Sequence, residues 1–113
     1  MDARIKAWEA AAAAEDKKAE DVVVMDFSQR DFVTDFFVIC TANNRLQANA
    51  IAEQIEEKVP GLGHREGASG ATWILLDYGD VVVHILTPES REYYALEKLW
   101  GDAEVVTKTG LLP

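Results

Sequence analysis

The side chains best suited to chemistry lie in one segment, WILLDYGDVVVHIL, which runs from Trp73 to Leu86. Asp77 and Asp80 flank a tight turn, and His84 follows in the second apolar run. Two carboxylates on neighbouring strands could hold Mg²⁺ for nucleotidyl or phosphoryl transfer, because Mg²⁺ binds one or two protein carboxylates together with substrate phosphates. The competing interpretation is that this hairpin presents a surface to a partner.

A transferase would also need cations and backbone donors for a triphosphate, and the sequence offers no segment of that kind. The glycine-rich stretches GLG (61–63) and GASG (67–70) match neither a P-loop nor a dinucleotide-binding motif. Aspartate is itself a common turn residue. The sequence therefore favours a turn role for Asp77 and Asp80, and a Mg²⁺-dependent nucleotidyl- or phosphotransferase that uses them is the alternative function.

No other residue pattern indicates an enzyme or a metal centre. His64 and His84 are the two histidines; neither lies in a His-Glu-x-x-His spacing, and no Cys-x-x-Cys pair is present. The serines lie outside any Gly-x-Ser-x-Gly elbow. The lone Cys40 lies within the apolar run 36–40, where a buried and inert thiol is expected. We therefore expect no catalytic residue, no metal and no cofactor.

Composition and charge restrict the class of partner. The 113 residues suit one domain, and 20 acidic against 11 basic residues give a formal net charge of −9. Nucleic-acid binders neutralise phosphates with Lys and Arg, so we expect no direct nucleic-acid contact, whereas an acidic surface favours a basic protein partner. The sequence shows no signal peptide and no apolar run near the ~20 residues of a membrane span. These features predict a cytoplasmic protein with no membrane contact.

Hydrophobic periodicity and cap residues predict the elements that position these side chains. The first helix is expected to turn Ile5, Trp8 and Ala12 to one face, and the strand after it is expected to be buried on both faces. The expected order is a helix at 3–19, strands at 21–27 and 36–41, a helix from Asn43 or Asn44 to about Val59, a short edge strand at 64–66, strands at 73–77 and 81–86, a helix from Thr87 to Leu99 or Trp100, and an extended stretch at 104–106. This order predicts an α/β fold with two layers and a mixed β-sheet, as one domain over residues 1–106 with a loose tail at 107–113.

The hairpin also has the composition of a contact surface. Strand alternation places Trp73, Leu75 and Asp77 on one face and Tyr78 on the other. Aromatic residues at the two ends of a strand, with carboxylates at the turn, are typical of a binding patch with aromatic anchors and a polar rim. Alternation alone leaves a second interpretation open, in which Trp73 belongs to the core and Tyr78 merely closes the turn.

Four segments together resemble the ribosomal silencing factor family, also called RsfS or Iojap. They are EDKKAEDVVVMDF (15–27), TDFFVICTANNRLQANAIAEQIEE (34–57), HREG (64–67) and WILLDYGDVVVHILTPESREYYALEKLWGDA (73–103). The last segment is the most specific, because its Asp-Tyr-Gly-Asp turn, histidine-bearing strand, proline-started helix and Leu-Trp-Gly-Asp ending occur in that order and spacing. The resemblance covers residues 3–106.

The resemblance implies a nucleotidyltransferase-like topology without enzymatic activity, and the chain lacks the Gly-Ser element and the Asp-x-Asp strand that nucleotidyltransferases use. It also implies a partner. Members of the family bind large-subunit ribosomal protein fourteen on the intersubunit face and sterically block joining of the small subunit, which represses translation when nutrients are short. Relatives in organelles assist large-subunit assembly. Pairing of two copies through the same apolar patch, as a homodimer, is a further hypothesis.

The resemblance also carries a set of partner-binding residues onto this chain. They are Trp73, Asp77, Tyr78, Gly79, Asp80, His84, Leu99 and Trp100. In this set the aromatic residues Trp73 and Tyr78 would be anchors, and the two aspartates would pair with lysine or arginine of the partner. The glycine would form the turn, while His84 and Trp100 are the members expected to support the patch from behind.

Overall fold

The computed structural model describes residues 1–28, 34–68, 70–95 and 104–106. Helices and strands follow one another along the chain in the predicted order. Their bounds are α1 (Ala3–Asp16), β1 (Glu20–Asp26), β2 (Phe36–Thr41), α2 (Arg45–Lys58), β3 (His64–Glu66), β4 (Trp73–Asp77), β5 (Val81–Leu86), α3 (Pro88–Tyr94) and β6 (Glu104–Val106). The predicted α/β class is confirmed, and the predicted tail at 107–113 lies outside the described residues.

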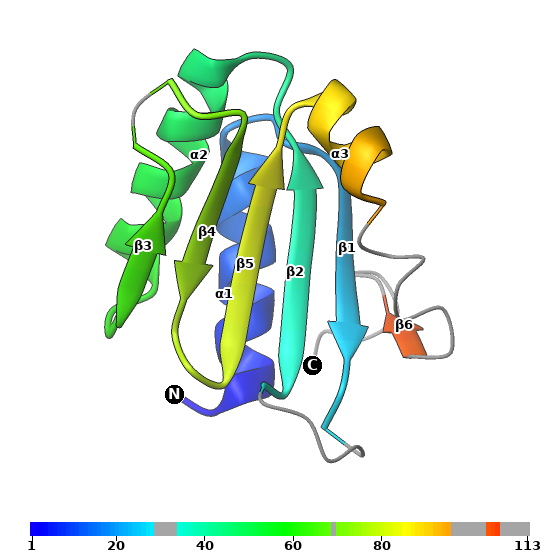
Figure 1. Cartoon of the computed structure of the whole chain (residues 1–113). Helices are drawn as coiled ribbons and strands as arrows, with labels where there is room; N and C mark the ends of the chain where they lie inside the picture. Colours follow the sequence, from blue (N-terminus) through cyan, green and yellow to red (C-terminus); the bar gives the residue numbers. More distant parts are fainter. Residues whose placement is uncertain (29–33, 69, 96–103, 107–113) are drawn as a thin grey trace.

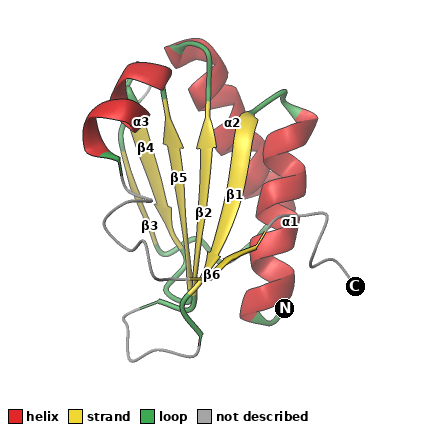
Figure 2. Cartoon of the chain, turned by 90° about the vertical axis from the view of Figure 1, so that its right-hand side faces the viewer, coloured by secondary structure: helices red, strands yellow, loops and turns green. Residues whose placement is uncertain are grey.

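The fold has two layers. Helices α1 and α2 lie behind the sheet in Figure 1, and the side view in Figure 2 shows both of them against the same sheet face, with the short α3 on the other side. The strand order is β3-β4-β5-β2-β1-β6. Strands β2 and β5 pair in parallel, and the remaining pairs are antiparallel. The predicted mixed sheet is therefore confirmed.

Helix α2 forms where the sequence caps it. The Asn44 side chain accepts a hydrogen bond from the Gln47 amide at 2.8 Å, so Asn44 rather than Asn43 is the N-cap. The apolar residues that recur along α2 at helical spacing are each at most 1% exposed: Ala48, Ile51, Ala52, Ile55 and Val59. The 3.6-residue period of this stripe is sufficient to orient the helix on the sheet.

Helix α1 packs mainly through alanines. Its fully buried alanines are Ala7, Ala10, Ala11 and Ala14, and Trp8 is 2% exposed. The expected stripe was wrong for Ile5, which is 44% exposed. Small side chains let the helix backbone lie close to the sheet, so the alanine-rich side of α1 faces inward although it lacks the bulk of isoleucine.

Strand β1 is less buried than predicted. Glu20 and Asp21 are exposed, so the expectation of a strand buried on both faces was wrong for its first half. Strand β6 pairs only with the segment from Val24 to Asp26. The start of β1 therefore has a described neighbour strand on one side only, which leaves room for charged side chains.

Helix α3 is shorter than predicted. It ends at Tyr94, because Ala95 adopts a left-handed conformation with φ of 47° and its amide donates to the Arg91 carbonyl at 2.9 Å. A helix through Leu99 or Trp100 was therefore wrong, and residues 96–103 lie outside the described part of the chain. None of the residues of α3 is fully buried, so packing adds little to extend the helix.

A second apolar cluster lies on the sheet face away from α1 and α2. Its fully or nearly buried members are Met25, Phe27, Phe37, Ile39 and Leu86, and Val23, Trp73 and Val82 pack against them partly exposed. These positions alternate along the strands with those of the main core. Both sheet faces therefore contain packed apolar side chains.

Gly67 is the glycine whose replacement should disturb this fold most directly. It has φ of 88°, and an added Cβ would lie 2.5 Å from the Trp73 carbonyl oxygen. We expect Gly67→Ala to lower the free energy of unfolding by about 3 kcal/mol, since backbone strain and overlap add. The matched control is Gly61→Ala, where φ is 93° but nothing lies within 4 Å; it should cost only about 1 kcal/mol. Urea unfolding measures both, and equal losses would contradict the prediction.

Candidate functional site

The β4–β5 hairpin brings six of its side chains onto one sheet face. Three cross-strand pairs form this set, which we call the hairpin face: Trp73 with Leu86, Leu75 with His84, and Asp77 with Val82. Trp73, Leu75, Asp77 and Val82 are partly exposed. The hairpin face lies on the side of the sheet away from α1 and α2 and thus presents apolar and acidic groups at the surface.

Trp73 is held in place from two sides. Its indole Nε1 donates to His84 Nδ1 at 3.2 Å, and its ring lies 4.5 Å from the ring of Tyr94 between centroids. His84 in turn packs edge-on against Phe37, with ring centroids 4.7 Å apart. A large, partly exposed aromatic residue is thereby fixed in one orientation, which is what a binding anchor requires.

His84 is neutral in this arrangement. An indole N–H can only donate, so Nδ1 of His84 must be the acceptor and the ring proton lies on Nε2. The residue is 4% exposed, and burial lowers its pKa to about 4. Nε2 has no hydrogen-bond partner among the described residues. These features agree with the expected support role for His84 and leave it no exposed nitrogen for acid–base chemistry.

Of the two carboxylates at the turn, Asp77 bonds to the turn itself and Asp80 pairs with a lysine of α1. Asp77 Oδ1 accepts from the Gly79 amide at 2.7 Å, and Gly79 has φ of 88°, which favours glycine there. Asp80 Oδ1 lies 2.8 Å from Lys6 Nζ of α1. In the described ranges, no group of three or more His, Cys, Asp or Glu side chains could hold a metal ion. The arrangement therefore supports the turn role and gives the Mg²⁺ alternative no geometric support.

Tyr78 is buried, whereas a binding anchor has to be exposed. It is 8% exposed within the main core, on the side of the sheet covered by α1 and α2. Its hydroxyl donates to the Val59 carbonyl at 2.9 Å, and burial, with a smaller effect of Glu56, raises its pKa to about 12. The structure therefore separates Tyr78 from Trp73 and makes it part of the link between β4 and α2.

The structure adds two aromatic residues that the carried-over set lacks. Tyr93 is 81% exposed and Tyr94 is 46% exposed, and their rings lie 5.0 Å apart between centroids. Through Tyr94 they continue the surface from Trp73 onto α3. Their signal in the sequence is a tyrosine pair less than two turns after the helix start at Pro88. Leu99 and Trp100, the other expected contacts, lie outside the described residues.

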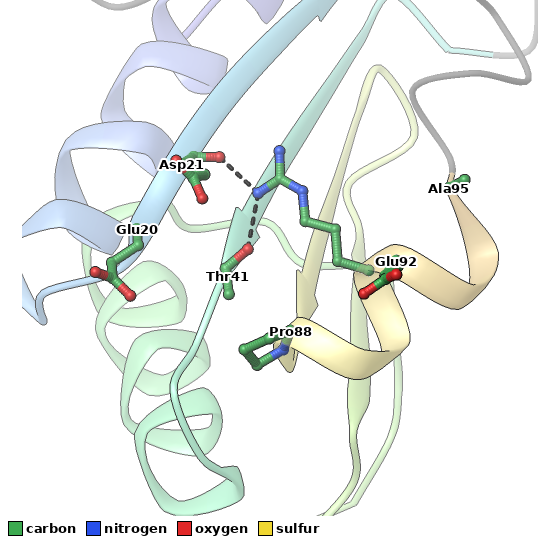
Figure 3. A pocket seen from close by; sticks show the side chains of 7 residues that line it. Glu20, Asp21, Thr41, Pro88, Glu92 and Ala95 are labelled. Carbon is green, nitrogen blue, oxygen red and sulfur yellow. Dashed lines mark hydrogen bonds between the residues drawn. The ribbon is translucent and has the colours of Figure 1, made fainter.

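A cavity of about 420 Å³ lies beside α3, between that helix and the start of β1 (Figure 3). Arg91 Nη1 donates to the Asp21 carbonyl at 2.6 Å and to Thr41 Oγ1 at 2.9 Å. These bonds attach α3 to β1 and β2. The cavity wall carries Glu20 and Glu92, so the acidic character of the chain is present here too. Its position makes this cavity part of the α3 attachment.

Fold and site together define a class: a small two-layer α/β protein whose candidate site is a surface for a macromolecular partner. The family model for RsfS, "Ribosomal silencing factor during starvation", matches residues 1–112. The chain belongs to the ribosomal silencing factor family, whose role is regulatory and non-catalytic. The predicted family membership is thereby confirmed.

Individual relatives agree with the family model. The chain is 46% identical over 98 residues to the ribosomal silencing factor RsfS of Bacillus subtilis, a match that covers 83% of each chain. It is 31% identical to the mouse "mitochondrial assembly of ribosomal large subunit protein 1", over 74% of this chain and 40% of that one. The crystal structure of a Chromobacterium violaceum protein, 30% identical, superposes with a TM-score of 0.84 and covers 100% of this chain and 91% of that one. No helix in the described ranges is long and apolar enough to cross a membrane.

Acidification should weaken the fold through His84. Its pKa of about 4 lies below the ordinary 6.5, so the unfolded chain binds the proton more readily between these values. The His84 contribution to stability is thus fully present above about pH 6.5 and is lost as the pH falls toward 4, by on the order of 3 kcal/mol. Urea unfolding of the wild type and of His84→Gln over this range measures the loss. His84→Gln should lose less stability on acidification than the wild type. Equal losses in the two proteins would contradict the assignment of this effect to His84.

Removing the Tyr78 hydroxyl should affect stability rather than the surface. Tyr78→Phe keeps the ring but deprives the Val59 carbonyl of its bond, and we expect it to lower the free energy of unfolding by about 1–2 kcal/mol. Tyr93→Phe is the control, because that side chain is 81% exposed; it should change stability by less than about 0.5 kcal/mol. Thermal or urea unfolding compares the two variants. If Tyr78→Phe left the free energy of unfolding unchanged, the buried hydrogen bond would contribute nothing to stability.

Proposed function

We propose that this protein binds the large ribosomal subunit through large-subunit ribosomal protein fourteen and thereby blocks association with the small subunit. The result is repression of translation in starvation. The observation that carries this proposal is the aromatic surface formed by Trp73, Tyr94 and Tyr93. Asp77 lies on the same sheet face at the other end of β4. Aromatic anchors at the surface of an acidic chain suit a basic protein partner.

Electrostatics supports a protein contact over an RNA contact. The formal net charge of −9 attracts basic ribosomal proteins and is repelled by the neighbouring RNA phosphates. This combination speeds encounter with a basic protein and disfavours other positions on the ribosome. The inhibition is steric, so it requires a stable contact and no chemistry. An interface of ordinary size, about 800 Å² on each partner, would be sufficient.

The same contact supports a second role in assembly of the large subunit. The mouse relative is named for assembly of the mitochondrial ribosomal large subunit. A factor that covers the intersubunit face of the large subunit keeps immature particles from joining small subunits. Silencing and assembly then use one surface, and the exposed aromatics would serve both.

Trp73→Ala should weaken binding to the large subunit about thirtyfold, because truncating an aromatic anchor costs roughly 2 kcal/mol or more. The control is Leu46→Ala, which truncates a side chain that is 82% exposed at the start of α2. Sucrose-gradient sedimentation of purified subunits with each variant measures co-migration with the large subunit and loss of the joined-ribosome peak. Wild type and Leu46→Ala should abolish that peak, whereas Trp73→Ala should leave it.

Two further measurements keep this test decisive. Thermal unfolding establishes that Trp73→Ala folds; if it does not, Tyr93→Ala, which removes an exposed ring of the same surface, replaces it. Sedimentation of the protein alone across a concentration series reports whether a second copy occupies the surface in a homodimer. Joined ribosomes that form undisturbed with wild-type protein would overturn the proposal.

A further inference from the structure

Helix α3 carries two of the three aromatic residues of the proposed surface but has little packing of its own. It has seven residues, and none of them is fully buried. Helices shorter than about 12–15 residues are marginal in water without tertiary contacts. The position of Tyr93 and Tyr94 relative to Trp73 therefore depends on the contacts that hold this helix to the sheet.

Arg91 supplies charge-assisted contacts of this kind. Its Nη1 donates to the Asp21 carbonyl at 2.6 Å and to Thr41 Oγ1 at 2.9 Å, at the cavity between α3 and the start of β1 (Figure 3). Thr41 ends β2 and is only 6% exposed, so one of the two acceptors belongs to the rigid part of the sheet. Arg91 and Tyr94 are three residues apart and lie on the same side of the helix. Bonds to the sheet at Arg91 therefore also fix the place of the Tyr94 ring.

The backbone of β1 is shaped for this contact. Two residues of β1 lie opposite one residue of β2 between the pairs Glu20–Thr41 and Val23–Ile39, which makes a β-bulge. Within the bulge Asp21 has φ of 50°, a left-handed conformation that is unfavourable in residues other than glycine. A bulge turns groups of the strand in a new direction, and the carbonyl of this strained residue is the one that accepts the guanidinium bond. Such strain persists where surrounding contacts hold it, often beside a functional site.

We propose that Arg91 is the positioning residue of the partner-binding surface. Its bonds to β1 and β2 fix α3 so that the Tyr94 ring packs against Trp73 while Tyr93 stays exposed. The identity of the partner rests on the proposed function, whereas the ring contact is a property of the free protein. Arg91 acts through the aromatic residues and does not itself touch the partner.

NMR of the free, full-length protein tests the positioning step without ribosomes. The rings of Tyr94 and Trp73 lie 4.5 Å apart between centroids and should give nuclear Overhauser effects in the wild type. Arg91→Gln removes the charge and shortens the side chain, so it should abolish these effects and leave the signals of the main core unchanged. Thr41→Val removes one of the two bonds and should weaken them in part. An unchanged ring contact in Arg91→Gln overturns the proposal.

Affinity for the purified large subunit tests the consequence for the partner. Arg91→Gln should weaken binding about tenfold and Thr41→Val about threefold, because the first loses both bonds to the sheet and the second loses one. Lys58→Gln is the matched control, since it removes one positive charge from the last turn of α2; it should bind like wild type. Equal losses in Arg91→Gln and Lys58→Gln would assign the effect to net charge and overturn the proposal.

A double-mutant cycle separates positioning from direct contact. In a chain that carries Tyr93→Ala and Tyr94→Ala, adding Arg91→Gln should weaken binding by less than about twofold more, because residues that act through one another are not additive. A further tenfold loss would show that Arg91 touches the partner and would overturn the positioning role. If the wild type fails to bind the large subunit, the proposed function is wrong, and the ring contact in the free protein still decides whether Arg91 positions the aromatic surface.

Discussion

Strand β2 pairs in parallel with β5 over its whole length, from Phe36 opposite Val81 to Thr41 opposite Leu86. Parallel neighbours cannot be joined by a tight turn, so the chain between them must cross the sheet, and α2, β3 and β4 make that crossing. All residues of β2 are buried. This pairing places the β4–β5 turn at one end of the strands and the start of α3 at the other. The hairpin face therefore depends on it.

The hairpin face owes its rigidity to a chain of ring contacts. Successive contacts connect exposed Tyr93 through Tyr94 and Trp73 to His84, and from there to Phe37 and Phe27 in the second apolar cluster. An anchor fixed in this way loses little side-chain entropy when a partner binds. Neutral His84 is essential to the arrangement, because a protonated ring could not accept the indole hydrogen bond.

Local signals predicted most elements well and some orientations poorly. Asn44 caps α2, and its apolar stripe is buried as its spacing requires, because cap and period act within a few residues of chain. Local signals did not predict the burial of Ile5 and Tyr78. The inward face of α1 depends on how closely that helix approaches the sheet, and the burial of Tyr78 depends on the carbonyl of Val59 on a distant segment. Neither partner is visible from neighbouring residues.

The sequence by itself determined the α/β class, the strand bounds of the hairpin, the family and the acidic net charge. Periodicity, turn chemistry and composition are local or additive properties, so they can be seen without a fold. Only the tertiary structure decided that Tyr78 is buried against the end of α2 while Trp73 stays partly exposed, and that Tyr93 and Tyr94 extend the surface. Such relations depend on contacts between distant segments, and these arise only when the sheet forms.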